Sequence, residues 1–354
     1  MKIGLVGLPG SGKTTLFKLL TGIKDDAYLS GMEATAGTAR VPDERIDYLS
    51  KLYEPRKTTY AQIDLVDLPG LNFSKEQKKG KNPFLTAVRN VDALVAVIQV
   101  FEEGLPHVLG EVNPGRDLEL IHSELLFADW EVIEKRIERL GAKKKKENEG
   151  ELKLLQRCRE ALEAESRLTN LSFTGEEAEL LRGFQFLTLK PMLVVLNLDP
   201  EGFKTGFPGK EGFIAGLQEK GLPFLEVSAR IEQEIAELSA DDRVLFMEDL
   251  GITEPGIDRL ARTVYRYLRL ISFFTVGEDE VKAWTITEGT TAKKAAGKIH
   301  SDIERGFIRA EVAAYQDLVA HGSMAKLKEK GLFRLEGKDY LVQDGDIISF
   351  RFNV

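Results

Sequence analysis

The residues whose types and spacing most clearly indicate chemistry are residues 7–14, which read Gly-Leu-Pro-Gly-Ser-Gly-Lys-Thr. They fit the phosphate-loop pattern G-x-x-x-x-G-K-[ST]. In such a loop, backbone amides surround the phosphates, the lysine reaches the β- and γ-phosphates, and the last hydroxyl is a ligand of Mg²⁺. The motif predicts a site for a nucleoside triphosphate, ATP or GTP, with Mg²⁺ as cofactor. The candidate phosphate-binding residues are Gly10, Ser11, Gly12, Lys13, Thr14 and Thr15, with Thr14 also a metal ligand and Lys13 also a catalytic group.

A second part of the expected site is the segment 64–70, which ends Asp67-Leu68-Pro69-Gly70. An aspartate at the carboxyl end of a buried strand can hold Mg²⁺, and a glycine amide can contact the γ-phosphate. We therefore take Asp67 as a metal ligand, the alternative being a cap or turn residue, and Gly70 as a catalytic residue. The next position, Leu71, cannot orient an attacking water as a glutamine would. Hydrolysis then needs another group or is slow, because the reaction depends mostly on positioning and charge stabilisation.

A third oxygen ligand of the metal is expected from the segment that follows the first helix. Ser30, Thr35 and Thr38 could each supply a hydroxyl, and the spacing does not select one of them. We take Thr35 as the candidate.

The nucleotide base is expected to lie beside two later loops. Residues 197–199 read Asn-Leu-Asp, whereas a guanine-specific site would have Asn-Lys-x-Asp, so neither the lysine nor the last aspartate is in place. Asn197 and Asp199 could still reach the base, although a turn at the start of a helix would use the same residues. The second loop follows a strand that ends at Val227 and offers backbone amides. The candidate base-binding residues are Asn197, Leu198, Asp199, Ser228, Ala229 and Arg230.

These motifs need a scaffold that brings strand ends together. Short apolar, β-branched runs bounded by polar or turn residues are typical of strands buried on both faces of a parallel sheet. Because such runs alternate with helical segments, the sequence predicts an α/β fold of the P-loop NTPase type with a mostly parallel sheet. The expected strands span residues 3–6, 61–66, 93–100, 192–196 and 224–227.

The stretch from residue 117 to about 182 is long, charged and nearly free of proline and glycine. Apolar residues at 126, 130, 133, 137 and 140 are spaced as in the seam of a coiled coil, and residues 155, 158 and 162 repeat that spacing. The pattern predicts an inserted antiparallel helical hairpin. Its turn carries lysines 143–146, which either solubilise the tip or contact RNA.

The last part of the chain changes character again, with a strand-like run 281–286, a short helix near 292–299 and a hairpin-like stretch 340–352. This pattern predicts a small α+β domain. The expected domains are residues 1–116 and 188–275 for the two parts of the P-loop domain, 117–187 for the helical coiled-coil insertion and 276–354 for the C-terminal domain.

Composition limits the classes of function. The 354 residues are 43% hydrophobic and 30% charged, with a net charge of −8, which predicts two or three folded domains and argues against a DNA-binding protein. The single cysteine, Cys158, excludes an internal disulfide and indicates a reducing compartment, the cytoplasm. The sequence contains no run of 18 or more apolar residues, so no membrane-spanning helix is expected.

With these motifs the sequence resembles the YchF-type, or Obg-like, ATPases of the translation-factor class of P-loop GTPases. The resemblance spans essentially the whole chain and is most specific in residues 283–286 (Ala-Trp-Thr-Ile), 306–311 (Gly-Phe-Ile-Arg-Ala-Glu) and 342–346 (Val-Gln-Asp-Gly-Asp). It implies that the C-terminal domain is a ubiquitin-like TGS domain and that the protein hydrolyses ATP or GTP and associates with the ribosome or ribosomal RNA. Where the family has a glutamate that favours adenine, this sequence has Pro200, and the first-switch threonine falls on Gly31.

Two functions are compatible with these features. The first is a slow, Mg²⁺-dependent nucleoside triphosphatase that acts as a nucleotide-switched, ribosome-associated factor, as Lys13, Thr14 and Asp67 indicate. The alternative is a nucleotide-gated RNA- or ribosome-binding module with negligible hydrolysis, which Leu71 favours. A metabolic kinase is disfavoured because the sequence contains no recognisable acceptor site or lid.

Overall fold

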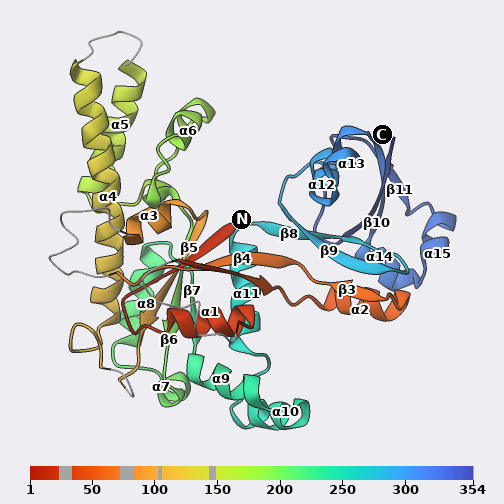
Figure 1. The fold of residues 1–354 in the computed structure, drawn as a ribbon, viewed down its shortest axis with the longest axis horizontal. Helices are drawn as coiled ribbons and strands as arrows, with labels where there is room; N and C mark the ends of the chain where they lie inside the picture. Colours follow the sequence, from red (N-terminus) through yellow and green to blue (C-terminus); the bar gives the residue numbers. More distant parts are fainter. Residues whose placement is uncertain (24–33, 72–82, 103–105, 143–148, 354) are drawn as a thin grey trace. The chain divides into compact units, whose positions relative to one another are not determined.

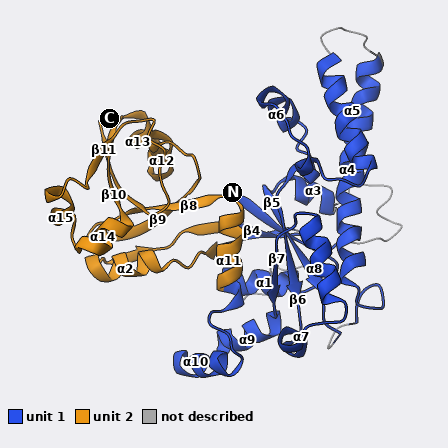
Figure 2. Ribbon diagram, turned by 180° about the vertical axis from the view of Figure 1, so that it is seen from behind, with its two compact units in different colours: residues 1–38, 64–257 blue, residues 39–63, 258–354 orange. Residues whose placement is uncertain are grey.

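The computed structural model describes residues 1–23, 34–71, 83–102, 106–142 and 149–353. It consists of two compact units, residues 1–38 with 64–257, and residues 39–63 with 258–354 (Figure 2). The second unit therefore contains a segment from the amino-terminal third of the chain, a grouping that differs from the domains expected from the sequence. Ser30, Gly31 and lysines 143–146 lie outside the described residues.

The first unit is built on a six-stranded sheet with the strand order β2-β4-β1-β5-β6-β7 (Figure 1). Strand β1 pairs in parallel with β4 and β5, and β6 pairs in parallel with β5 and β7. The mostly parallel α/β sheet predicted from the sequence is therefore confirmed. The strands are β1 (Lys2–Val6), β2 (Thr35–Arg40), β4 (Gln62–Asp67), β5 (Ala93–Gln99), β6 (Met192–Asn197) and β7 (Phe224–Val227).

The centre of this sheet is apolar on both faces. Every residue of β5 and β6 is buried, as their continuous apolar sequences require. Their side chains pack with those of helices on the sheet, including Phe84 and Leu118, in one core. The helices around this sheet are α1 (Lys13–Thr21), α3 (Pro83–Arg89), α7 (Pro200–Thr205), α8 (Lys210–Glu219), α9 (Ala229–Glu237), α10 (Ala240–Asp249) and the start of α11 (Gly256–Tyr267).

Between β5 and β6 the chain forms the predicted antiparallel helical hairpin, α4 (Pro114–Ala142) and α5 (Glu149–Glu163) (Figure 1). Its core contains the apolar side chains of the predicted seam, and ion pairs of Arg136 with Glu151 and of Glu134 with Arg159 set the antiparallel register. The chain returns to the sheet through η4 (Leu168–Asn170), α6 (Gly175–Arg182) and η5 (Leu187–Leu189). None of the described helices is both long and apolar enough to cross a membrane.

The second unit contains a mixed six-stranded sheet with the order β11-β10-β12-β8-β9-β3. Its central strands β12 and β8 are parallel, whereas β8 with β9 and β10 with β11 and β12 are antiparallel, so an α+β fold is present in the C-terminal part. The ubiquitin-like TGS assignment stays a prediction. The elements are α2 (Glu44–Tyr53), β3 (Lys57–Thr59), β8 (Leu270–Thr275), β9 (Glu280–Thr287), α12 (Ala292–Ile299), α13 (Ser301–Arg305), β10 (Phe307–Ala314), α14 (Tyr315–His321), α15 (Met324–Glu329), β11 (Arg334–Glu336) and β12 (Asp346–Phe352).

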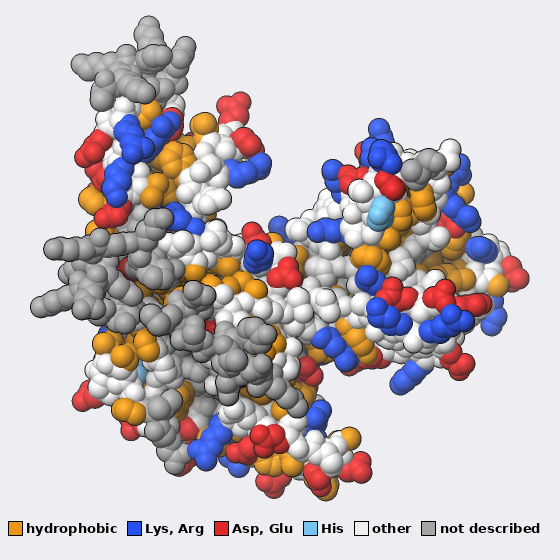
Figure 3. Space-filling model, in the orientation of Figure 1, with side chains coloured by type: hydrophobic (Ala, Val, Ile, Leu, Met, Phe, Trp, Pro, Cys, Tyr) orange, Lys and Arg blue, Asp and Glu red, His pale blue; other side chains and the backbone are white. Residues whose placement is uncertain are grey.

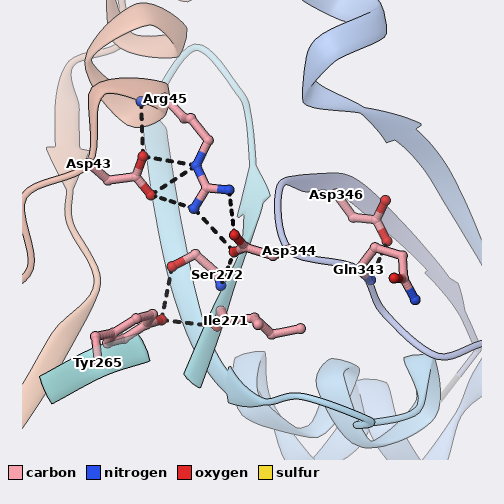
Figure 4. A network of polar contacts seen from close by, with 8 residues as sticks. All are labelled: Asp43, Arg45, Tyr265, Ile271, Ser272, Gln343, Asp344 and Asp346. Carbon is pink, nitrogen blue, oxygen red and sulfur yellow. Dashed lines mark hydrogen bonds and ion pairs between the residues drawn. The ribbon is translucent and has the colours of Figure 1, made fainter. Parts of the chain in front are cut away.

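Polar contacts hold the segment 39–63 against the C-terminal part of the second unit (Figure 4). Arg45, in the first turn of α2, forms ion pairs with its N-cap residue Asp43 and with Asp344, each at 2.8 Å. Asp344 also accepts a hydrogen bond from the amide of Ser272 in β8 at 2.9 Å. The parallel pairing of β3 with β9 adds backbone hydrogen bonds to the same association.

Candidate nucleotide-binding site

A cavity of about 290 Å³ lies at the carboxyl ends of several strands of the first unit. In open α/β sheets this edge is where ligands bind. The lining residues come from the phosphate loop with the start of α1, from the ends of β5 and β6, and from the start of α9. They are Gly10, Gly12, Lys13, Thr14, Thr15, Phe101, Asn197, Leu198, Asp199, Ala229, Arg230 and Gln233.

The phosphate loop has a backbone conformation that its glycines permit. Gly10 and Gly12 have φ of 83° and 93°, in the left-handed region that side chains disfavour. A Cβ atom on Gly12 would also collide with the side chain of Asn197. Helix α1 starts at Lys13 with no side-chain cap and no acidic residue in its first turn. Its first amides and its dipole are therefore available to an anion.

Lys13 is buried although its side chain carries an ammonium group, with 6% of the residue exposed. Its Nζ donates hydrogen bonds to the carbonyls of Gly7 at 3.1 Å and Leu8 at 3.0 Å. Burial lowers the pKa of Lys13 to about 8, and the negative charge of Asp67 only partly opposes this effect. Because a neighbouring anion favours the charged form, a phosphate in the cavity would stabilise the protonated lysine.

Thr14 and Asp67 bring two oxygen ligands together. The Thr14 hydroxyl donates a hydrogen bond of 2.6 Å to Oδ2 of Asp67. The other carboxylate oxygen, Oδ1, is buried and has no hydrogen-bond partner among the residues that the structure describes. Burial raises the pKa of Asp67, while the Thr14 hydroxyl and the Lys13 charge act in the opposite direction.

This pair fits a magnesium site. Mg²⁺ prefers hard oxygen ligands and is usually held by one or two carboxylates together with substrate phosphates and water. Within the described ranges no group of three or more His, Cys, Asp or Glu could hold a metal without such help. The unpartnered Oδ1 of Asp67 is the oxygen that a divalent cation would satisfy.

Asn197 joins the two loops on either side of the cavity. Its Nδ2 donates to the carbonyl of Ser11 at 3.0 Å, and its Oδ1 accepts from the amide of Ala229 at 3.0 Å. Only 3% of Asn197 is exposed, so both bonds are shielded from water. In this structure its amide therefore positions the phosphate loop and the start of α9 relative to one another.

Asp199 and Ser228 are helix caps. The Asp199 side chain accepts from the amide of Gly202 at 2.6 Å at the start of α7, where Pro200 is the first helical residue. The Ser228 hydroxyl accepts from the amide of Ile231 at 3.4 Å at the start of α9. Asp199 thus has the helix-starting role that the sequence left open, and it also lies at the cavity wall.

Five of the candidate residues do not line the cavity: Ser11, Asp67, Gly70, Ser228 and Thr35. Gly70 lies against Pro9 of the phosphate loop, since a Cβ on it would be 3.2 Å from Pro9 Cγ. Thr35 is the first residue of β2, at the edge of the sheet. The side chain of Leu71 is buried in the core, with 2% of the residue exposed.

Two lining residues, Phe101 and Gln233, are not among the site residues predicted from the sequence. Both have a signal that could have identified them. Phe101 follows the carboxyl end of β5 by two residues, and Gln233 lies four residues after Ala229, on the same face of α9.

A buried pair joins His107, which precedes α4, to Asp117 in the first turn of α4. Nε2 of His107 lies 2.6 Å from Oδ2 of Asp117, and Arg116 contacts Oδ1 of the same carboxylate at 2.8 Å. The Asp117 carboxylate therefore fixes the orientation of the His107 ring.

The parallel sheet, the phosphate loop and the Thr14–Asp67 pair define a P-loop protein of the GTPase fold. Comparison with family models agrees, because a family described as 50S ribosome-binding GTPase matches residues 2–149. A second model, the C-terminal domain of YchF-type GTPases, described as a protein of unknown function, matches residues 270–353.

Known proteins identify the family. The chain is 41% identical to the ribosome-binding ATPase YchF of Bacillus subtilis (strain 168), covering 99% of both chains. It is 39% identical to the ribosome-binding ATPase YchF of Escherichia coli O157:H7, covering 100% of this chain and 99% of that one. The solved structure of the Schizosaccharomyces pombe YchF GTPase matches with a TM-score of 0.88 and 29% identity, covering 99% of this chain and 97% of that chain. This chain belongs to the YchF family.

Proposed function

We propose that this protein is a Mg²⁺-dependent ATPase that uses its nucleotide state to control association with the ribosome in the cytoplasm. The observation that carries the proposal is the arrangement of Lys13 and Thr14 in the cavity wall, with Asp67 directly behind them in hydrogen-bond contact with Thr14. A buried ammonium, an uncapped helix start and an unpartnered carboxylate oxygen together provide what a triphosphate and its divalent cation need.

Different residues would bind the phosphates and the magnesium ion. The amides of Gly10, Ser11, Gly12 and Thr15 and the ammonium of Lys13 would hold the phosphates, as the loop chemistry predicts. Thr14 and Asp67, with Thr35 as the third candidate, would hold the magnesium ion, which neutralises phosphate charge when bound.

Hydrolysis would depend on Lys13 and on the amide of Gly70, both of which would stabilise charge on the γ-phosphate. The structure gives a physical reason to expect a slow reaction. Because the Leu71 side chain is buried in the core, the position after Gly70 offers nothing to orient water.

The base would bind between Asn197, Leu198 and Asp199 on one side and the Ser228, Ala229 and Arg230 loop on the other. One feature supports adenine over guanine. The loop after β6 has Leu198 and Pro200 where a guanine site would have the lysine and the last aspartate. The names of the curated relatives, which are ribosome-binding ATPases, support the same choice.

The names of these relatives, and the family model that matches residues 2–149, support the ribosome as the binding partner. A nucleotide-dependent change at residues 64–71 would pass along β4 into the segment 39–63, which packs with the C-terminal part of the second unit. In related folds, nucleotide hydrolysis changes the order and the position of such switch segments.

One pair of measurements tests the proposal. In the first, ATP and GTP are each titrated as competitors of a bound fluorescent adenine nucleotide in the presence of Mg²⁺. In the second, phosphate release is measured with and without ribosomes. The proposal requires that ATP competes more strongly than GTP and that purified 50S subunits or ribosomes bind in a nucleotide-dependent way. ATP-dependent ribosome binding with no phosphate release above background would favour the alternative, a nucleotide-gated binding module.

A further inference from the structure

Helix α10 presents apolar and acidic side chains together to solvent. It has no buried residue, although its sequence, Ala-Asp-Asp-Arg-Val-Leu-Phe-Met-Glu-Asp, contains four large apolar residues in a row. Leu245 is 65% exposed and Val244 is 55% exposed, and Leu245 is the most exposed large apolar residue in the part of the chain that the structure describes. Figure 3 shows hydrophobic and acidic side chains side by side over this region.

The two faces of α10 differ in composition. Residues Arg243, Phe246, Met247 and Leu250 follow the spacing i, i+3, i+4, i+7, and all are partly buried, so this stripe faces the protein. The opposite stripe, with the same spacing, is Asp241, Val244, Leu245 and Glu248, and all four are exposed. The apolar pair on the outer face therefore has a carboxylate about one helical turn away in each direction.

Of the outer residues, Asp241 favours the helix dipole from the first turn, but Val244, Leu245 and Glu248 are not needed for the helix to form. Ser239 caps it, because its hydroxyl accepts from the amide of Asp242 at 3.3 Å. Glu248 and Asp249 lie in the last turn, which contains no basic residue, and carboxylates there oppose the helix dipole at a cost of a few tenths of a kcal/mol. Neither the exposed apolar pair nor these two charges is explained by the stability of α10 itself.

We propose that the outer face of α10 is a docking surface for a protein partner whose binding segment combines apolar side chains with lysine and arginine. Between residues 237 and 249 the chain has five carboxylates and one guanidinium, so the surface repels RNA phosphates and anionic lipids. A basic amphipathic helix would place its apolar side chains on Val244 and Leu245 and its cations beside the flanking carboxylates. The carboxylates are Glu237, Asp241, Asp242, Glu248 and Asp249.

The test uses the full chain and a synthetic amphipathic helical peptide of leucine and lysine as the probe. Binding is measured by fluorescence anisotropy at physiological ionic strength, and amide hydrogen exchange locates the bound peptide. The expected result is saturable binding that slows exchange within residues 240–249. Replacing Val244→Ser together with Leu245→Ser, or Asp241→Asn together with Glu248→Gln, should each weaken binding roughly tenfold, the size of a small hot spot.

Two controls separate this surface from general attraction to an acidic protein. Leu335→Ser removes a comparably exposed leucine, 59% exposed, from β11 and should change the peptide affinity less than about twofold. The same peptide with glutamate in place of lysine should not bind. The proposal is overturned if the leucine–lysine peptide fails to bind, or if it binds the Val244→Ser, Leu245→Ser variant as tightly as the unchanged chain. It is equally overturned if sedimentation shows a dimer of the unchanged chain that this variant dissociates, because the face would then cover a second copy.

Discussion

The hydroxyl of Thr14 donates a 2.6 Å hydrogen bond to Asp67, and this contact joins the phosphate loop to the end of β4. The two residues are 53 positions apart in the sequence, yet they lie together because β1 and β4 are parallel neighbours. The contact leaves Oδ1 of Asp67 buried and without a partner in the described part of the chain. The proposed magnesium site depends on this arrangement.

The first prediction concerns Asp67→Asn. The change keeps the size of the side chain but removes its charge, so the gain in nucleotide affinity that Mg²⁺ provides should fall by roughly tenfold or more, about 1.4 kcal/mol. Titration of a fluorescent nucleotide with Mg²⁺ and with EDTA measures this gain. Asp64→Asn, on an exposed position of the same strand, is the matched control and should leave it unchanged. An equal Mg²⁺ effect in the unchanged chain and in Asp67→Asn would remove Asp67 from the metal site.

The second prediction concerns Asn197→Ala. The substitution leaves the Ser11 carbonyl and the Ala229 amide without their partner in a buried place. Because an unsatisfied buried polar group costs about 1–3 kcal/mol, the free energy of unfolding should fall by about 2–4 kcal/mol, and nucleotide affinity should fall with it. Denaturant unfolding and nucleotide titration measure the two effects. Asn170→Ala, at an exposed asparagine, should change neither; similar losses in both variants would contradict the positioning role.

The third prediction concerns the partly buried side chain of His122 on α4. Burial, followed by the positive charges of Arg167 and Lys220, lowers the pKa of His122 to about 4 from the usual 6.5. Between these values the unfolded chain binds more protons than the folded chain, so stability is full above pH 6.5 and falls as the pH drops toward 4.

The variant His122→Gln removes this titration. The free energy of unfolding of the unchanged chain should drop by about 2–3 kcal/mol more than that of the variant over this range, at about 1.4 kcal/mol per pKa unit. Urea unfolding at a series of pH values measures the difference. The control His321→Gln, at the end of α14, should follow the unchanged chain, whereas parallel curves for the chain and His122→Gln would show that His122 does not cause the loss.

The fourth prediction concerns the Arg45–Asp344 ion pair in the second unit. Its side chains are 26% and 48% exposed, so screening limits its contribution, and a double-mutant cycle of Arg45→Ala and Asp344→Ala should give a coupling of about 0.5–1 kcal/mol. Arg45→Lys should recover little of it, since lysine cannot bond two carboxylates with a planar fork. Fluorescence of Trp284 in a Trp130→Phe background reports unfolding of this unit. Independent effects of the two substitutions would contradict a joint role in holding segment 39–63.

The sequence predicted those parts of the molecule that local patterns determine. Lys13 and Thr14 belong to one short motif, and Asp67 ends a strand in which apolar residues recur, so their convergence follows from a parallel sheet. The seam of α4 and α5 could also be predicted from a local pattern, because the apolar residues of a coiled coil repeat at a fixed spacing.

Other features depend on contacts that no local pattern contains. The side-chain amide of Asn197 bonds to Ser11 and Ala229 because the end of β6 passes between the two loops. These bonds could be predicted only from the arrangement of the strands. The grouping of residues 39–63 with the C-terminal part comes from the pairing of β3 with β9, more than two hundred residues later in the chain. Strand pairs this distant in sequence have no periodic signature that could reveal them.

The most direct test of the central claim is a crystal structure of the chain grown with a non-hydrolysable ATP analogue and Mg²⁺. The account predicts the β- and γ-phosphates beside Lys13, and the metal ion between the oxygens of Thr14 and Asp67. It would be contradicted by crystals in which, at saturating nucleotide, this cavity holds no phosphate or the nucleotide lies elsewhere on the protein.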